Sequence, residues 1–401
     1  MLLSAQIGGF RSCENVRLEN IQNVLLLVGR NGVGKTNVLK AIEWAARTAS
    51  AVAPIESDEA SSRMPCEVTL RLRLNGQVIV YSVRLLREAG RKEGGLRFLS
   101  HYLVESMAIE GGRIVFFREK GDLTVGDIDP TSLKVGFMTP AAYSILSLVP
   151  KHESAELLAY FVSFAKAIRY YPLEEFEAKE SHDFVSLRDY EAWRGGESGS
   201  AKNANETLVL KLLDLYLQKR ATFDELSSLL GPEGLDIINK ITVTEFEVPI
   251  GSGDLGAEAN GSKKMKYYFV EFSPARHRKE SEFAFASLSF GTRRIVRLLT
   301  ALLFDDTTVS LIEQPEDGIH AGLLHKLVPL LNAYADPRQF IITSHSSQVL
   351  NQAKPEQIRI VDLEEGVTTL RALDATEVTA AENFINGDGP MADFLETVQG
   401  S

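Results

Sequence analysis

The sequence predicts an α/β protein whose core is a parallel β-sheet, with an antiparallel β layer and a helical insertion beside it. Apolar strands alternate with amphipathic helices in the last third of the chain, an order typical of βα units on a parallel sheet. Residues 66–119 alternate apolar and polar side chains, which indicates antiparallel strands with one buried face. Residues 140–240 change to helical spacing.

The composition is that of an ordinary globular protein. A length of 401 residues suggests two or three domains, and 44% hydrophobic with 24% charged residues excludes wholesale disorder. The formal net charge of −11 argues against a generally basic nucleic-acid coat. No apolar run approaches the ~18 residues that span a bilayer, and the start lacks a secretory signal. Only Cys13 and Cys66 occur, which excludes a disulfide framework, so we expect a cytoplasmic protein without a membrane partner.

The first third predicts two strands, a helix and the β layer. Residues 4–10 form the first strand, and the apolar run Val24–Val28 is typical of a strand buried on both faces. Residues 37–47 repeat apolar side chains at helical spacing, and residues 49–62 predict an exposed loop. Asn75-Gly76 between alternating apolar runs indicates a hairpin.

The remaining elements lie in the insertion and the last third. Helices are expected at residues 155–168 and 208–217, with a Gly/Ser-rich break between them that begins at Arg194. We therefore divide the chain into residues 1–139, a helical insertion at 140–240, and residues 241–401. Further strands and helices are expected at 241–248, 266–272, 291–303, 309–312, 321–335, 339–342, 346–352 and 358–361, with a Gly-rich loop at 251–262.

A phosphate-binding loop follows the first buried strand. Gly29–Thr36 matches G-x-x-x-x-G-K-[ST] at every fixed position, with an apolar strand before it and an amphipathic helix after it. Glycines let backbone N–H groups surround phosphate oxygens, and the helix start adds positive potential. Lys35 would reach the β- and γ-phosphates, and the Thr36 hydroxyl would contact Mg²⁺. The candidate nucleotide-binding residues here are Arg30, Asn31, Gly32, Val33, Gly34, Lys35, Thr36 and Asn37.

Three later stretches supply further candidates. The apolar strand before Glu313 ends in carboxylates, where a P-loop ATPase places its second Mg²⁺ contact. A neighbouring apolar strand ends at His345. Ser289 and Gly291 stand at the start of a helix, which is a second helix end suited to an anion.

These motifs, in this order, make the sequence resemble the ABC-type ATPases of the SMC/RecF branch. These are often described as AAA-family ATP-binding proteins and are related to the ATPase part of overcoming-lysogenization-defect nucleases. Gly29–Thr36 matches Walker A, Leu288–Thr292 the ABC signature, Leu311–Pro315 Walker B, and His345 the switch histidine. The resemblance covers residues 1–48 and 270–350, and it implies a P-loop NTPase head of the ABC type.

The resemblance also implies how ATP and Mg²⁺ are used. Two copies would face each other head to tail, with ATP on the Walker A loop of one completed by Ser289 and Gly291 of the other. Thr36 and Glu313 would contact Mg²⁺, and hydrolysis would separate the heads. About 250 residues separate Thr36 from Leu288, which suits a compact arm and not a long coiled coil.

The catalytic acid departs from the family pattern. The family usually has an Asp for Mg²⁺ and then a Glu for the attacking water, whereas this chain has Glu313-Gln314. An amide cannot act as a base near neutral pH. Three readings stay open: Glu316 takes the role, Gln314 orients the water, or hydrolysis is slow and partner-stimulated while ATP holds the dimer together. An engineered Glu→Gln exchange is a further explanation.

The histidines and the basic residues have competing interpretations. The position of His345, one strand beyond Glu313, favours a γ-phosphate sensor over a core residue. For His320, packing near the dimer seam is favoured over chemistry. Its five-residue spacing from His325 argues against a metal site. Basic clusters at residues 84–97, 263–266 and 276–279 fit a solvated face and a nucleic-acid groove equally well.

The leading functional hypothesis is a cytoplasmic, homo-oligomeric ATPase that acts as a molecular switch. Only 56 residues follow His345, too few for an appended nuclease domain of about 100 residues. We therefore expect a separate effector, a nuclease or toxin, in anti-phage defence. One alternative is a RecF-like DNA-binding ATPase in DNA repair and recombination. A transporter ATPase is disfavoured by the long insertion and the lack of a membrane segment.

Overall fold

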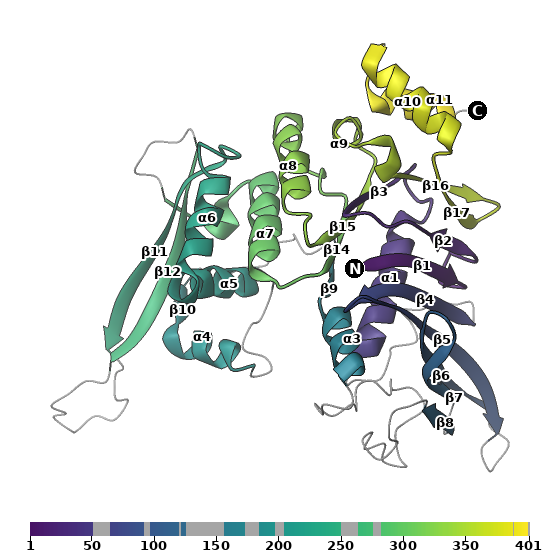
Figure 1. Cartoon of the computed structure of the whole chain (residues 1–401). Helices are drawn as coiled ribbons and strands as arrows, with labels where there is room; N and C mark the ends of the chain where they lie inside the picture. The colour runs from purple at the N-terminus through teal and green to yellow at the C-terminus, as the bar shows by residue number, and fades with distance from the viewer. Residues whose placement is uncertain are drawn as a thin grey trace. The chain divides into compact units, whose positions relative to one another are not determined.

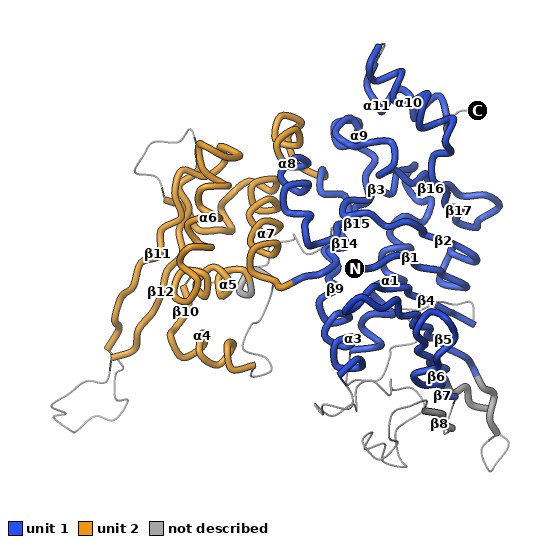
Figure 2. The backbone as a smooth tube through the Cα atoms, in the orientation of Figure 1, with its two compact units in different colours: residues 1–172, 307–316, 328–401 blue, residues 173–306, 317–327 orange. Residues whose placement is uncertain are grey.

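The chain divides into two compact units in a computed structural model (Figure 2). Unit 1 comprises residues 1–172, 307–316 and 328–401, and unit 2 comprises residues 173–306 and 317–327. These two units are compact in space, whereas the predicted boundaries after residues 139 and 240 divide the sequence into three consecutive segments. The predicted boundaries therefore stay a prediction. The residues described are 1–50, 65–91, 97–119, 122–125, 156–172, 184–196, 204–249, 264–275, 282–387 and 389–399.

Unit 1 is built on a mainly parallel sheet with the strand order β17-β16-β3-β15-β14-β9 (Figure 1). Neighbours from β16 to β9 run parallel, and β17 pairs antiparallel with β16. Every residue of β3 and β15 is buried, as expected for central strands of a sheet covered on both faces. The bounds are β3 Val24–Val28, β9 Ile168–Tyr171, β14 Val309–Glu313, β15 Gln339–Ser344, β16 Ile358–Glu364 and β17 Val367–Ala372.

A buried glutamine of this sheet ties it to the start of the chain. Gln339, which begins β15, is 1% exposed. Its Oε1 accepts the Leu2 backbone N–H at 2.6 Å, and its Nε2 donates to the Leu2 carbonyl at 2.9 Å. The Nε2 group also contacts the carbonyls of Ile21 and Gln22 at 3.3 and 3.4 Å. The amide therefore satisfies main-chain groups from the start of the chain and from the segment before β3.

The second sheet of unit 1 is the predicted antiparallel layer, with the order β2-β1-β4-β5-β6-β7-β8. Asn75 and Gly76 both have positive φ, as a two-residue hairpin turn between β4 and β5 requires. The bounds are β1 Leu2–Gly8, β2 Val16–Leu18, β4 Cys66–Leu74, β5 Gln77–Arg91, β6 Arg97–Ile109, β7 Arg113–Glu119 and β8 Asp122–Val125.

Helix α1 (Lys35–Ser50) joins the two sheets of unit 1 into one core. It contacts β1 and β4 of the antiparallel layer, β9, β14 and β15 of the parallel sheet, and α3 (Glu156–Lys166). Its apolar side chains, such as Val38, Leu39 and Ile42, lie in a single buried cluster with residues of both sheets. The helix that starts at the phosphate loop is therefore held on both sides.

Two differences from the predicted elements of unit 1 concern the end of a helix and the start of a loop. The helix expected at 155–168 ends at Lys166, and Ile168 begins β9 at the edge of the parallel sheet. Ile168 continues the helical spacing of apolar residues and is also the first residue of a four-residue strand, so periodicity alone could not place the boundary between helix and strand. Ala49 and Ser50 complete α1, although a loop was expected from residue 49. The rest of that loop and the loop at 251–262 lie outside the described residues.

Unit 2 combines a small antiparallel sheet with helices. β11 and β12 pair along a hairpin longer than the strands predicted there, and β10 and β13 pair with β12. Helices α4 and α5 contact β12, and α7 contacts both α5 and α6. The bounds are β10 Phe184–Ser186, α4 Leu187–Arg194, α5 Ala204–Gln218, α6 Arg220–Leu230, β11 Ile238–Pro249, β12 Lys264–Pro274, β13 Phe283–Ala284, the short 3₁₀ helix η4 Phe285–Ser287 and α7 Phe290–Phe304.

The rest of the chain is mainly helical. α8 (Ala321–Ala333) lies between β14 and β15 in the sequence, and α9 (Ser347–Leu350) and a short 3₁₀ helix (Pro355–Gln357) follow β15. The chain ends in α10 (Ala375–Gly387) and α11 (Met391–Gln399), which contact each other. Among the described residues, no helix has the length and apolar character needed to cross a membrane.

Candidate nucleotide site

The predicted phosphate loop connects β3 to α1 in unit 1. Gly32 and Gly34 have φ values of +83° and +101°, a region that glycine adopts far more readily than other residues. A Cβ atom on Gly34 would lie 2.0 Å from Thr368 Oγ1 and 2.8 Å from Ser12 Oγ. Gly34 is therefore required both by its backbone conformation and by the two hydroxyl groups packed against it.

Lys35 is folded back onto the loop. Lys35 is only 5% exposed, and its Nζ donates to the carbonyls of Gly29 at 2.6 Å and Arg30 at 2.7 Å. Burial lowers the pKa of the Lys35 ammonium, and the nearby carboxylates of Glu316 and Glu313 act in the opposite direction. The loop thus holds a cation in a largely desolvated position, where its attraction for a phosphate is strong.

Thr36 and Glu313 meet at the start of α1. The Thr36 hydroxyl donates to Glu313 Oε1, and the Tyr170 hydroxyl donates to Glu313 Oε2 at 2.5 Å. Glu313 ends β14 and Tyr170 lies in β9, so two adjacent parallel strands bring these groups together. The Thr36 and Glu313 oxygens are the hard ligands that Mg²⁺ prefers, and Mg²⁺ takes most of its other ligands from water and phosphate. The described residues contain no cluster of three or more His, Cys, Asp or Glu suited to a metal.

Gln314 lies directly after β14 in a strained conformation, with φ of +39°. Its backbone N–H donates to the Thr343 carbonyl and hydroxyl at 3.0 and 3.1 Å. Its Nε2 lies 3.0 Å from Nδ1 of His345. An amide nitrogen can only donate, so Nδ1 is the acceptor of this contact. The end of β15 therefore fixes both the backbone and the side chain of Gln314.

Glu316 is 7% exposed and contacts the same strand end. Its Oε1 accepts from Ser344 Oγ at 2.8 Å and from the His345 backbone N–H at 2.9 Å. Within the described part of the chain, the buried Oε2 atom has no hydrogen-bond partner. Glu316 thus holds the turn that carries His345, and its contacts are those of a positioning group.

The signature residues lie in unit 2. Ser289 caps α7: its Oγ accepts from the Thr292 N–H at 3.2 Å and lies 2.8 Å from the Thr292 hydroxyl. Ser289 is exposed on its own subunit. A Cβ atom on Gly291 would lie 2.4 Å from the Gly318 carbonyl, so the helix start packs tightly on the segment after Walker B.

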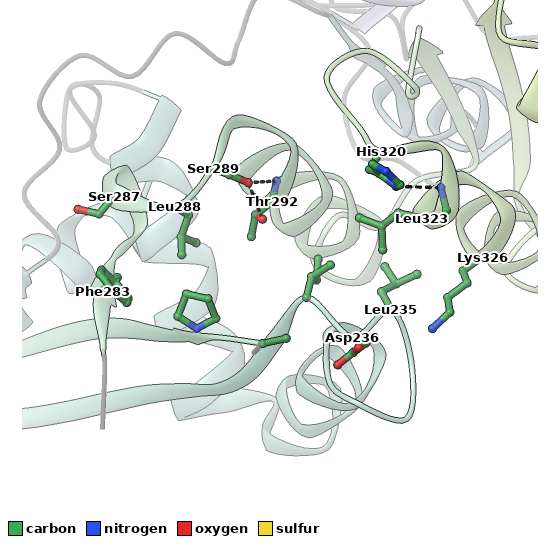
Figure 3. Close-up of a pocket in the computed structure, with 14 residues that line it drawn as sticks. Leu235, Asp236, Phe283, Ser287, Leu288, Ser289, Thr292, His320, Leu323 and Lys326 are labelled. Atoms are coloured by element: carbon green, nitrogen blue, oxygen red, sulfur yellow. Dashed lines mark hydrogen bonds between the residues drawn. The ribbon is translucent and has the colours of Figure 1, made fainter. Parts of the chain in front are cut away.

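A cavity of about 660 Å³ adjoins the signature in unit 2 (Figure 3). Ser289 and Thr292 line it from the start of α7, and His320 and Lys326 line it from the opposite segment. Lys326 Nζ donates to the Gly234 carbonyl at 2.7 Å. The predicted packing role of His320 near a dimer seam stays a prediction, because the structure contains one copy.

The structure therefore brings most candidates together and leaves two in the other unit. Lys35, Thr36, Glu313, Gln314, Glu316 and His345 all lie in unit 1, at or beside the ends of α1, β14 and β15. Arg30, Asn31 and Gly32 are exposed, and Val33 is buried. The Asn37 side chain bonds Ser12 at 2.8 Å and Arg11 at 3.3 Å.

Sequence reasoning missed the partners of these residues. Tyr170 lies in a strand of which only the first residue, Ile168, fell in a predicted helix, and Thr343 precedes His345 without a motif of its own. Ser12 and Thr368 are far from the loop in sequence, so only the fold could reveal them. For Tyr170, the strand-like run Ile168–Tyr171 was the available signal.

One predicted basic cluster is neutralised in the structure. Lys264 pairs with Glu247 at 3.0 Å, and Lys266 pairs with Glu245 at 2.7 Å, across the β11–β12 hairpin. A phosphate backbone would compete with these carboxylates for the two ammonium groups, so the pairs do not favour a nucleic-acid groove there. Lys263 and residues 276–279 lie outside the described residues.

Comparison with known proteins gives one family match and several similar solved structures. Residues 24–123 and 253–351 match the family described as "AAA domain, putative AbiEii toxin, Type IV TA system". The solved structure of an Smc head bound to the C-winged helix domain of ScpA is 14% identical, with a TM-score of 0.51 over 94% of this chain and 99% of that chain. No curated protein matches the sequence.

Two further SMC heads are similar at lower scores. The SMC head domain from Thermotoga maritima is 15% identical, with a TM-score of 0.44 over 93% of this chain and 99% of that chain. The Pyrococcus furiosus Smc head with an extended coiled coil, bound to the C-terminal domain of ScpA, is 13% identical, with a TM-score of 0.47 over 96% and 99%. The match over residues 24–123 and 253–351 indicates an AAA domain, and the first head structure shows that the chain has the fold of an SMC head, so the predicted fold class is confirmed.

Proposed function

We propose that this ATPase is a molecular switch in which two copies bind ATP and Mg²⁺ between them and control a separate effector, a nuclease or toxin, in anti-phage defence. The observation that carries the nucleotide site is the convergence of Lys35, Thr36 and Glu313 at the start of α1. The link of the proposal to toxin–antitoxin systems is supported by the matched family, whose description names an AbiEii toxin of a Type IV system. The SMC heads bound to ScpA are a precedent for heads that bind another protein.

The residues present fit ATP and Mg²⁺. Lys35 and the loop N–H groups would hold the phosphates, and Thr36 and Glu313 would hold Mg²⁺. When bound, Mg²⁺ neutralises charge on the phosphate oxygens. Ser289 and Gly291 would complete the site of a second copy, for which the exposure of Ser289 is a requirement that the structure meets.

Hydrolysis in this proposal is slow. Gln314 and His345 would orient a water molecule, because their mutual contact fixes the amide without supplying a base. Glu316 would act by holding the Ser344–His345 turn, since its Oε1 atom is committed to that turn. A slow ATPase suits a switch whose bound state must persist until a partner acts.

The nucleotide site is tested by Lys35→Ala. The variant removes a charge-assisted contact to phosphate, so ATP affinity should fall about 30-fold or more. Binding is measured by titration with a fluorescent ATP analogue. Arg47→Ala is the matched control, because Arg47 is an exposed cation in the last turn of the same helix. Wild-type protein that fails to bind ATP, or equal affinity in Lys35→Ala, would refute the site.

A further inference from the structure

We propose that Thr368 and Ser12 are positioning residues for the phosphate loop, which they orient through a chain of hydrogen bonds ending on the Val33 carbonyl. The proposal rests on the proposed nucleotide site and adds residues from outside its sequence motif. Ser12 follows β1, and Thr368 lies in β17, at the opposite end of the sequence from the loop.

Four side-chain contacts form this chain. Arg11 Nη1 donates to Asn37 Oδ1 at 3.3 Å, and Asn37 Nδ2 donates to Ser12 Oγ at 2.8 Å. The hydroxyl oxygens of Ser12 and Thr368 lie 2.7 Å apart. The Thr368 hydroxyl donates to the Val33 carbonyl at 2.8 Å.

Proton counting gives the chain one direction. A hydroxyl has one proton, and Thr368 uses its proton on the Val33 carbonyl, so Ser12 must donate to Thr368. Ser12 in turn accepts from Asn37, whose oxygen accepts from the Arg11 cation. The donors therefore all run in one direction, from Arg11 to the Val33 carbonyl, and hydrogen bonds aligned in this way polarise one another.

The chain fixes the orientation of one peptide group. The carbonyl and N–H of a trans peptide point in opposite directions. Holding the Val33 carbonyl toward Thr368 therefore holds the Gly34 N–H pointing away from Thr368. A phosphate loop works only if it presents N–H groups and turns carbonyls away from the anion. Thr368 thus blocks the flipped peptide, whose carbonyl would repel phosphate.

Packing supports the same role. Thr368 is 1% exposed, and its backbone N–H donates to the Ser12 carbonyl at 2.8 Å, so the turn between β1 and β2 holds this part of β17 in place. The space that a Cβ atom on Gly34 would fill is taken by Thr368 Oγ1. The loop glycine and the Thr368 hydroxyl are therefore complementary in shape as well as in hydrogen bonding.

The test uses nucleotide-free protein and one near-isosteric exchange. Thr368→Val should raise amide hydrogen exchange in residues 33–37 about tenfold and weaken binding of a fluorescent ATP analogue by a similar factor, because a buried carbonyl loses its donor. Thr368→Ser keeps the hydroxyl and should restore both values. Thr369→Val on the same strand is the matched control. It should change neither value, since Thr369 is not part of the series of hydrogen bonds from Arg11 to Val33. Thermal unfolding confirms that each variant is folded.

Ser12→Ala is the second variant, and it carries the test if Thr368→Val does not fold. It removes the proton donated to Thr368 and should raise exchange in residues 33–37 by a smaller factor. The positioning role would be overturned if folded Thr368→Val showed unchanged amide exchange and unchanged ATP affinity. If Thr368→Val does not fold, unchanged amide exchange in Ser12→Ala would overturn it. That result differs from failure of the nucleotide site, in which wild type binds no ATP or Lys35→Ala binds as well as wild type.

Discussion

In the proposed switch, Gln314 is the residue that keeps hydrolysis slow. Its amide lies against His345 where a carboxylate would accept a proton from water. Gln314→Glu should therefore raise the rate of phosphate release by about 100-fold, the lower range for general base catalysis. Steady-state phosphate release measures it, and Gln314→Ala is the control that should show no gain. A rate that Gln314→Glu leaves unchanged would mean that another group already supplies the base.

The two buried cysteines should lower the free energy of unfolding as the pH becomes alkaline. Burial raises the pKa of Cys13 to about 11 and of Cys66 to about 12, from an ordinary value of 9.0. Above pH 9 the unfolded chain releases these protons while the folded chain keeps them, so the free energy of unfolding must fall as pH rises from 9 toward 11. Urea unfolding at pH 8 and pH 10.5 should show a smaller decline for the Cys13→Ala/Cys66→Ala variant than for wild type. Equal declines would show that the thiols do not titrate as buried groups.

Among the elements, the antiparallel layer of unit 1 contains a buried charge pair. Glu105 is fully buried on β6, and Arg118 on β7 is 4% exposed, with 3.9 Å between Arg118 Nη1 and Glu105 Oε2. The Tyr81 hydroxyl also donates to Glu105 at 2.8 Å. Arg118→Met should lower the free energy of unfolding by about 3 kcal/mol, because it leaves a carboxylate buried without its cation.

The matched control for Arg118→Met lies on the same sheet. Arg84 pairs with Glu67 at 2.9 Å, but both side chains are well exposed. Water screens such a pair, so Arg84→Met should cost less than about 1 kcal/mol. Denaturant unfolding of both variants measures the difference. Similar losses in the two variants would contradict the importance of burial.

The elements also show what the sequence could and could not predict. β3, α1 and the loop between them were predictable because their signals are local: an apolar run, a glycine-rich motif and helical spacing. β9 was hard to predict, because the run Ile168–Tyr171 is a weak local signal and a four-residue strand gains its identity from pairing with β14, about 140 residues later. Thr368 was hidden for the same reason, since its neighbour in space is a loop at the other end of the chain.

For the whole molecule, the proposed switch requires two copies. Addition of ATP to the wild-type protein should double the molar mass measured by light scattering, because slow hydrolysis preserves the ATP-bound dimer. Ser289→Arg should prevent this doubling by placing a bulky side chain where the second copy would contact the phosphates. Ser289 is exposed, so the substitution should leave thermal unfolding unchanged. A mass that ATP does not change in the wild-type protein would refute the head-to-tail dimer.

Gln339 bears on how this protein could be redesigned. Protein designers usually fill the middle strands of a parallel sheet with valine, isoleucine and leucine. Here that habit would fail, because Gln339→Leu would leave the Leu2 amide and carbonyl without their side-chain partner inside the protein. A redesign of β15 that keeps Gln339 should retain the hydrogen bonds that hold β1, whereas a fully apolar β15 should lose them.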